Sequence, residues 1–288
     1  MAAQRPVAAI AGLTPAPARV GRDGALSLRV ERRGLRSVLG GCRWTLPLQI
    51  LAPMALDDPA VIVSMLNPTG GLVGGDRLAI DVAVGARAHV CLTTPSATKV
   101  YRTSGEPVEQ TVRLTLEKEA RLEWVPDHTI PFAGAALRQR VEADVAEGAT
   151  LLLVDAFAAG RVARGEAWRF ALLDSTLSAR DAGGWLLHDR LVLREGAPGP
   201  GLGLAEDRPY VATVVVIADV GVAAFTEDVA ALDSGDDVDV GAALLPRRGA
   251  LVRCLAADAP ALVRTVDAVW AFARRRVLGL PALALRKP

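Results

Sequence analysis

The sequence has 288 residues, of which 51% are hydrophobic and 4% aromatic, and its formal net charge is +1. This length is enough for one large domain or two small ones, with a substantial core in either case. A nucleic-acid-binding protein usually carries a basic excess or a basic stripe, so the near-neutral charge argues against that class. The cysteines Cys42, Cys91 and Cys254 are odd in number and widely spaced. This pattern argues against a secreted disulfide framework and predicts a cytoplasmic protein.

The two most apolar stretches do not predict a membrane protein. The run 211–225 contains Asp219 and is too short to cross a bilayer. At the N-terminus, the apolar stretch 7–13 is preceded only by Arg5 and followed by Pro-Ala-Pro-Ala. Prolines at the cleavage position argue against a signal peptide. We therefore interpret residues 1–22 as a flexible tail.

From residue 25 to 218 the sequence predicts short strands separated by turns. Residues 26–31 alternate apolar and polar side chains, and the apolar run 61–66 ends at a strong turn signal, Asn67-Pro-Thr-Gly-Gly. The same rhythm predicts strands at 77–84, 108–117, 121–125, 137–145, 150–157, 167–179, 185–194 and 210–217. A strand and turn every ten residues or so, without long helical periods, favours a mainly β fold of stacked antiparallel or mixed sheets, an elongated β-solenoid-like scaffold. It argues against a βαβ architecture.

The C-terminal quarter predicts the clearest helix. Asp258 is a credible N-cap, Pro260 falls in the first turn, and Gly279 and Pro281 end the pattern. Apolar residues recur at helical spacing, which places Arg264, Asp267, Arg274 and Arg275 mostly on the opposite, solvent-facing side. A shorter helix is expected at 223–232, and the glycine- and proline-rich loop 195–203 is interpreted as a surface excursion. We expect one domain over 23–288, with a β body at 25–218 and a helix-containing part at 222–280.

Two segments are rich in residue types that occur in nucleotide-binding loops or in catalytic sites. The cluster Gly70-Gly71-Leu-Val-Gly74-Gly75-Asp76 lacks the Lys-Ser/Thr of a phosphate loop, and no helix follows it as a dinucleotide loop requires. A glycine-rich turn with positive φ angles is the favoured interpretation. The segment 93–102 contains Thr94, Lys99 and Tyr101, but the order and spacing of tyrosine and lysine do not fit a known catalytic pair.

The remaining candidates are histidines and carboxylates in apolar surroundings. His89 and Cys91 share one strand face, where a soft metal site and a hydrogen-bonded core histidine are the alternatives. Asp155 and Asp189 interrupt apolar strands, and a carboxylate there must be paired or face water. Structural ion pairs are one explanation, with Arg161, Arg164 and Arg190 as local partners. A polar passage through the molecule is the other, because an isolated carboxylate holds a divalent ion loosely.

Four segments stand out in this order: 67–76 (NPTGGLVGGD), 93–102 (TTPSATKVYR), 122–135 (LEWVPDHTIPFAGA) and 160–166 (GRVARGE). As an ordered set they resemble the motifs of the UreD (UreH) urease accessory proteins. Pro95-Ser96 and Asp127-His128 depart from the usual pattern of the family. The resemblance assigns motif and partner-contact roles to residues in the first, second and fourth segments: Gly70, Gly71, Gly74, Gly75, Thr94, Lys99, Tyr101, Arg161 and Glu166.

The resemblance implies a non-enzymatic scaffold and nickel-insertion chaperone. Its implied partners are UreF, the GTPase UreG and the subunits of apo-urease, and it admits a dimer within the accessory complex. No cofactor is expected to bind tightly: nickel would be in transit, past Asp76, Thr98, Asp155 and Asp189, and GTP belongs to UreG. The alternative from another class is a β-sandwich hydrolase with His128 or His188 as base beside a carboxylate. A third interpretation, an all-β structural or adhesive module, is disfavoured by the odd cysteine count.

Overall fold

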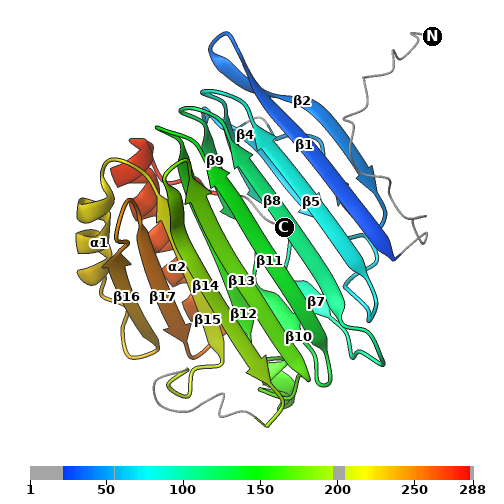
Figure 1. Cartoon of the computed structure of the whole chain (residues 1–288). Helices are drawn as coiled ribbons and strands as arrows, with labels where there is room; N and C mark the ends of the chain where they lie inside the picture. Colours follow the sequence, from blue (N-terminus) through cyan, green and yellow to red (C-terminus); the bar gives the residue numbers. More distant parts are fainter. Residues whose placement is uncertain (1–21, 55, 197–204, 286–288) are drawn as a thin grey trace, which may run out of the picture.

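The computed structural model describes residues 22–54, 56–196 and 205–285. Two large β-sheets are stacked face to face, and two α-helices of the described chain cover the outer face of one sheet (Figure 1). The predicted N-terminal tail, except Arg22, and most of the predicted surface loop at 195–203 lie outside the described residues. The division into a tail and a single domain stays a prediction.

The first sheet has seven strands in the order β14-β13-β11-β8-β5-β1-β2. Its inward positions alternate with exposed ones, as expected for a sheet with one face in the core and one in water. The strands are β1 (Asp23–Arg33), β2 (Arg36–Thr45), β5 (Arg77–Val84), β8 (Val108–Leu116), β11 (Ala136–Val145), β13 (Leu172–Asp181) and β14 (Gly184–Arg194).

The second sheet has ten strands, eight of them in the order β16-β17-β15-β12-β9-β6-β4-β3, with β10 and β7 attached beside β12. Several of its strands are continuous apolar runs, because this sheet is covered on both faces. The strands are β3 (Gln49–Ile50), β4 (Val61–Leu66), β6 (His89–Thr93), β7 (Thr98–Val100), β9 (Arg121–Val125), β10 (Thr129–Pro131), β12 (Thr150–Ala158), β15 (Tyr210–Ile217), β16 (Val238–Leu244) and β17 (Ala250–Ala256).

The chain winds between the two sheets as in a β-solenoid. β4, β6, β9 and β12 lie in the ten-stranded sheet, and β5, β8, β11 and β13 alternate with them in the seven-stranded sheet. Within each sheet these strands pair in parallel. Each parallel connection runs through the other sheet, so no crossover helix is needed. The predicted mainly β, solenoid-like fold is therefore confirmed.

The core has two apolar layers. The first lies between the two sheets and includes Leu26, Leu114 and Leu122. The second lies between the ten-stranded sheet and the helices α1 (Val222–Ala230) and α2 (Ala259–Ala273), where Phe225 and Trp270 are buried. None of the described helices is long and apolar enough to span a membrane.

The predicted C-terminal helix is confirmed, including both of its ends. The Asp258 carboxylate accepts a hydrogen bond from the Ala261 backbone N–H at 2.7 Å, which satisfies one of the free donors of the first turn. A π-helical turn (Arg274–Leu278) continues α2 and ends at Gly279 with a φ of 67°. The shorter predicted helix is also present, as α1.

The prediction that Arg274 faces solvent is wrong. Its side chain is fully buried and forms ion pairs with Asp58 and with Glu123, the latter at 2.6 Å. These carboxylates are 216 and 151 residues away in the sequence, so helical periodicity alone could not reveal them. A buried guanidinium is tolerated because both carboxylates compensate its charge.

One strand prediction needs correction, and the strands that were not predicted include β2 and the pair β16 and β17. The strand expected at 167–179 begins only at Leu172, because the preceding residues form a tight turn in which Trp168 has a φ of 62°. Residues 238–244 and 250–256 form the hairpin β16–β17, which the sequence interpretation missed. Both strands pair at the margin of the ten-stranded sheet, and their pattern is less apolar than that of β15.

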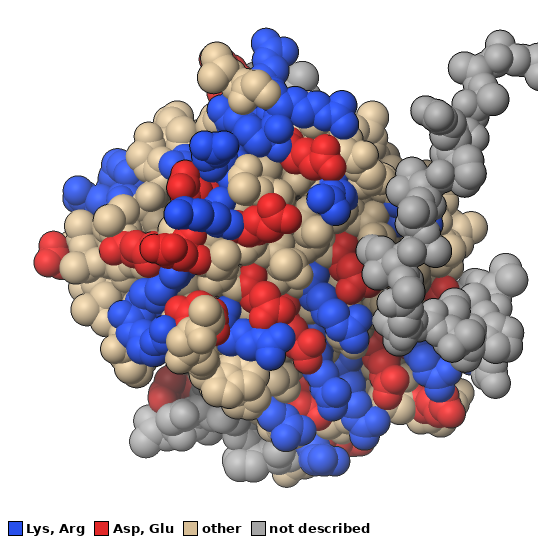
Figure 2. All heavy atoms as spheres, turned by 45° about the horizontal axis from the view of Figure 1, so that its top comes forward, with Lys and Arg blue, Asp and Glu red and all other residues tan. Residues whose placement is uncertain are grey.

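The outer face of the seven-stranded sheet carries charged side chains of both signs. Cross-strand pairs join Asp144 to Arg180, Asp174 to Arg190 and Asp81 to Arg113. Figure 2 shows acidic and basic side chains interspersed over the surface that it presents. Exposed pairs of this kind contribute little to stability, but they keep this face solvated.

Candidate functional site

The glycine-rich segment 67–76 packs tightly against β7. The Leu72 N–H donates to the Lys99 carbonyl at 2.8 Å, and the Tyr101 N–H donates to the Leu72 carbonyl at 2.8 Å. A Cβ at position 71 would lie 2.6 Å from the Tyr101 ring and 2.8 Å from the Lys99 oxygen. Glycine is therefore required at position 71 so that two chain segments can touch.

The other glycines of this segment have related reasons. Gly70 and Gly75 both have a φ of 82°, the left-handed region that favours glycine. A Cβ at Gly74 would lie 2.8 Å from the Thr103 methyl group. The cluster forms a closely packed turn, as the sequence predicts. Two of its glycines are explained by a positive φ angle and two by close approach of neighbouring residues.

An aromatic and ionic contact joins the remaining motif segments at the same end of the molecule. The ring of Phe132 meets the Tyr101 ring edge-on, with centroids 5.2 Å apart, and the Arg161 guanidinium lies 4.3 Å from the Phe132 centroid. Arg161 also donates two hydrogen bonds to Glu166, at 2.8 and 2.5 Å. The Thr94 hydroxyl accepts from the Asp127 N–H at 2.8 Å. All four motif segments thus meet near β7 and β10, at the bottom of Figure 1.

A small cavity of about 80 Å³ opens between the two sheets beside this assembly. Its lining includes polar residues from three motif segments, namely Asn67, Thr94, Thr98, Asp127 and Thr129. Deeper between the sheets it is lined by the polar side chains Gln110, Gln139 and Asp155, among apolar residues. The cavity therefore leads from the motif end of the molecule into the interior of the β-sandwich.

Asp155 on β12 is the charged centre of this interior. Its Oδ1 accepts from the Gln139 amide at 2.8 Å and its Oδ2 accepts from the Ser175 hydroxyl at 2.9 Å. The Gln110 amide donates in turn to the Gln139 oxygen at 3.0 Å. Burial raises the pKa of Asp155 to about 6, although these donors and the nearby Arg253 charge oppose the rise. The site therefore holds a carboxylate whose charge changes just below neutral pH.

Asp189 lies beyond Asp155 and is paired with Arg253. The Arg253 guanidinium donates to Asp189 Oδ1 at 2.6 Å and also to the Thr213 hydroxyl. Thr213 lies directly opposite Asp155 in the β12–β15 pairing, so the two side chains share the inner face. A continuous polar band therefore runs from the cavity to β14.

The ion-pair partners expected from the sequence are wrong for both aspartates. Among the described residues, Arg161 pairs with Glu166 and Arg190 with Asp174, while Asp189 pairs with Arg253 and Asp155 accepts from neutral donors. The local candidates failed because the pairing side chains come from strands distant in sequence. The sequence could have indicated Gln139 as a partner of a buried group. It is a polar residue at the inward position between Leu137 and Val141, in a strand whose other inward residues are apolar.

Asp76, the fourth residue assigned to the passage, lies elsewhere. Its Oδ2 accepts from the Val73 N–H at 2.9 Å and so closes the glycine-rich turn. Burial raises its pKa, while the Val73 N–H and the charge of Arg22 act in the opposite direction. Asp76 is not among the residues that line the cavity, whereas Thr98 and Asp155 are.

Comparison with known proteins agrees with the four assembled motifs. The sequence model of the UreD urease accessory proteins matches residues 22–288. The chain belongs to the UreD family. It is 34% identical to the urease accessory protein UreD of Delftia acidovorans, over 98% of this chain and 97% of that protein. It is also 34% identical to the UreD of an Anaeromyxobacter species, over 93% and 89%, and 32% identical to that of Haloarcula marismortui, over 93% and 91%.

Membership in the UreD family makes this chain an accessory protein with a role in urease maturation, and not an enzyme. The hydrolase alternative is therefore set aside. Its two candidate bases lie on different parts of the fold, one on β14 and one between β9 and β10. His188 is on β14, edge-on to the Trp185 ring, and His128 contacts the Tyr210 ring.

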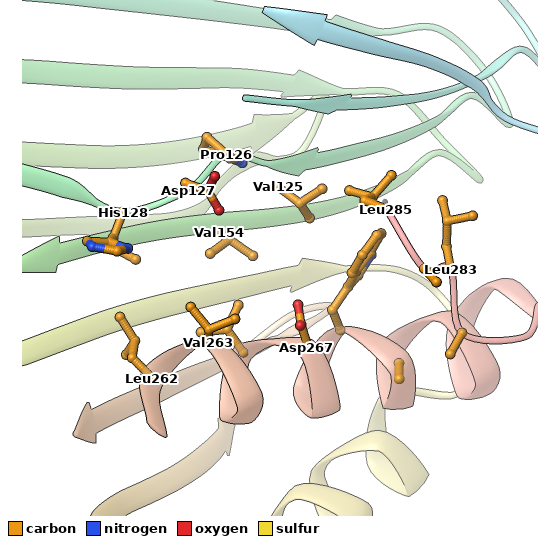
Figure 3. Close-up of a pocket in the computed structure, with 16 residues that line it drawn as sticks. Val125, Pro126, Asp127, His128, Val154, Leu262, Val263, Asp267, Leu283 and Leu285 are labelled. Carbon is orange, nitrogen blue, oxygen red and sulfur yellow. The ribbon is translucent and has the colours of Figure 1, made fainter. Parts of the chain in front are cut away.

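His128 lies at the rim of a second pocket of about 390 Å³, between α2, the end of β9 and the described C-terminal residues (Figure 3). The lining is mostly apolar and includes Val154, Leu262 and Leu285, with Asp127 and Asp267 as its carboxylates. Among the described residues that line it there is no serine, threonine or cysteine. Asp127 also lines the inner cavity, so the two pockets are neighbours on either side of the β9 end.

The histidine of the predicted His89–Cys91 pair belongs to a buried ionic cluster. His89 Nε2 donates to Glu123 at 2.8 Å, and Glu123 also accepts from Trp270 at 2.7 Å and from Arg274. Burial raises the pKa of Glu123, but these donors outweigh it and hold that pKa below its ordinary value. In the described part of the chain, no group of three or more His, Cys, Asp or Glu side chains is placed to hold a metal ion. The hydrogen-bonded core histidine is the interpretation that the geometry favours.

Proposed function

We propose that this chain is a cytoplasmic scaffold for urease maturation, which binds apo-urease together with UreF and UreG and assists GTP-dependent nickel insertion. Family membership supports the general role. In this proposal UreG hydrolyses GTP, nickel is the cargo, and the chain itself binds no cofactor tightly. Dimerisation within the accessory complex stays a prediction.

The polar band between the sheets supports a nickel passage. An ionised carboxylate inside an apolar sandwich costs free energy, and burial already makes Asp155 harder to ionise. Asp155 keeps only neutral direct donors, Gln139 and Ser175, and it faces a cavity. A divalent cation that enters this cavity would gain the attraction of the carboxylate.

The ligand set favours transit over storage. The oxygens of Thr98, Asp155 and Asp189 are spread along the band, and a carboxylate with amide and hydroxyl neighbours is a hard, low-affinity site for nickel. The proposed path runs from the cavity at Thr98 past Asp155 to Asp189, where Arg253 closes the band. Asp76 is assigned to the glycine-rich turn and not to this path.

The motif end of the molecule is the proposed contact region for the accessory partners. Gly70, Gly71, Tyr101, Phe132 and Arg161 brace one another there. Their sequence neighbours Asn67, Leu72 and Thr98 line the cavity. A partner seated on this end would deliver cargo directly to Thr98. Lys99 is exposed on β7 and forms no ion pair within the part of the chain that the structure describes, so its charge can serve such a contact.

The test is co-expression of the tagged chain with its host's urease subunits, UreF and UreG, followed by measurement of nickel in the purified urease. Omission of the chain should abolish loading, and Asp155→Ala or Asp189→Ala should lower it while the complex still forms. Asp144→Ala is the matched control, because Asp144 is exposed on the outer face of the sandwich. Normal nickel content with both aspartate variants would refute the passage. Normal loading without the chain would refute the scaffold itself.

A further inference from the structure

The edge of the seven-stranded sheet at β2 has an unusual combination of features. β2 is ten residues long and pairs with β1 along one side only, and it forms the last strand of the sheet order among the described residues (Figure 1). None of its residues is fully buried. Such an edge presents a row of free backbone N–H and C=O groups, which another extended chain can pair with.

The side chains of β2 fall into two rows with different chemistry. In the pairing with β1, Trp44, Cys42 and Leu39 lie opposite the buried residues Leu26, Leu28 and Val30, so they belong to the inward face. Arg43 and Arg36 lie opposite Ser27 and Arg33 and belong to the outward face. The edge therefore offers an apolar row on one face and a basic row on the other.

The basic row lacks carboxylate partners within the described chain. Glu31 pairs with Arg29 and Arg33, but neither Arg36 nor Arg43 forms an ion pair with any described residue. Elsewhere in the same sheet the outward arginines Arg113, Arg180 and Arg190 are matched by acidic neighbours, whereas the outward Arg140 forms no ion pair with a described residue. Unmatched arginines beside an open edge attract an acidic chain.

The apolar row continues into exposed side chains next to the edge. Trp44 is 44% exposed, and Leu46, Leu51 and Leu56 are exposed on the segment that follows β2. An open groove of about 670 Å³ separates the start of β2 from the segment that carries Met54 and Leu56, together with the carboxylates Asp57 and Asp58. Arginines alone on an edge strand would be explained as charges that prevent edge-to-edge pairing with other chains. Together with tryptophan and leucine they have the composition of an interface, because Trp and Arg dominate binding energy at protein contacts.

We infer that β2 is a docking strand for an extended segment of a partner protein that alternates apolar and acidic residues. The segment adds to the sheet as an eighth strand, with its apolar side chains beside Leu39 and Trp44 and its carboxylates beside Arg36 and Arg43. At about 3.3 Å per residue, a segment of about ten residues covers β2. This surface is separate from the proposed nickel passage and does not depend on it.

Charge disfavours a second copy of the chain in the register that places the middle of the two β2 strands together. In a two-fold antiparallel pairing of β2 with β2 centred on Leu39 and Gly40, Arg36 of each copy would lie opposite Arg43 of the other. Like charges directly opposite one another destabilise a strand pair. An acidic partner strand places opposite charges at the same positions.

The test uses the full-length chain and a fluorescently labelled ten-residue peptide of alternating valine and glutamate, with binding measured by anisotropy. The wild-type protein should bind it, and the peptide with lysine in place of glutamate should not bind. Two peptides N-methylated on alternate residues, one at every valine and one at every glutamate, keep the charge. The one whose methylated N–H groups face β2 should not bind, because it loses the strand hydrogen bonds. Absence of binding, or binding of the lysine peptide or of both N-methylated peptides equal to that of the unmodified glutamate peptide, would overturn the inference.

Two variants locate the site. Arg36→Glu/Arg43→Glu should weaken binding of the glutamate peptide at least about tenfold and should gain binding of the lysine peptide. Arg264→Glu, which reverses an exposed arginine on α2, should change neither. Hydrogen exchange of the wild-type protein gives an answer that needs no variant: the peptide should slow exchange of the β2 amides at residues 36–45. Slowing confined to any other element would contradict the assignment of β2.

Discussion

Replacement of Asp155 by asparagine should stabilise the fold and should also lower the nickel loading of urease. The pKa of about 6 means that the ionised carboxylate of Asp155 destabilises the folded state at neutral pH. This pKa is about 2 units above that of an ordinary aspartate, and at pH 7 that difference lowers the free energy of unfolding by about 3 kcal/mol. Asparagine keeps the shape and can still accept from Ser175, but the network with Gln139 must rearrange, at a cost of about 1 kcal/mol. We expect a net stabilisation of about 1–2 kcal/mol.

The sign of the pH dependence follows from the raised pKa. Because the folded state binds this proton more tightly than the unfolded state, the contribution of Asp155 to stability is complete below about pH 4 and is lost as the pH rises through about 6. The advantage of Asp155→Asn should therefore be small at low pH and largest above pH 7. For a chain of this size, about 1–2 kcal/mol raises the melting temperature by roughly 2–8 °C.

The assay is thermal unfolding of both proteins from pH 4.5 to 8, with the nickel content of co-expressed urease measured in parallel. Asp144→Asn serves as the control, since Asp144 is an exposed member of a surface ion pair. A variant that is more stable at pH 8 and loads less nickel would show that the buried charge is kept for function. A variant less stable than wild type at every pH would refute the reasoning, because Asp155 would then be a structural residue.

Three further outcomes follow from contacts of the described chain. Arg274→Gln should destabilise the protein by about 3–5 kcal/mol in chemical denaturation, because it leaves the carboxylates buried without their countercharge; a loss under 1 kcal/mol would contradict this. Gly71→Ala should cost about 1–3 kcal/mol by the same measurement, since its methyl group would overlap the neighbouring ring, whereas Gly241→Ala, with open space around it, should cost far less. Arg161→Lys should lose the two-point contact with Glu166, so hydrogen exchange in the 160–170 turn should accelerate; unchanged exchange would show that charge alone holds the turn.

The sequence by itself determined the fold class, the C-terminal helix and the family. Alternation along strands such as 77–84 and the caps at Asp258 and Gly279 are local signals, and local physics decides them. The four motifs are likewise contiguous in sequence. The β16–β17 hairpin was missed because strands at a sheet margin show weaker patterning.

Only the tertiary structure decided which polar groups meet. The partners of Asp155, Asp189 and Arg274 come from strands and loops 16 to 216 residues away. Pairing of buried charges depends on which elements the solenoid brings together, and no local pattern encodes that. For the same reason only the folded structure distinguishes Asp76 from the other residues assigned to the passage. Asp76 closes a turn, while Thr98 and Asp155 face one cavity. The open edge of β2 is also a property of strand order, which the sequence of the strand does not contain.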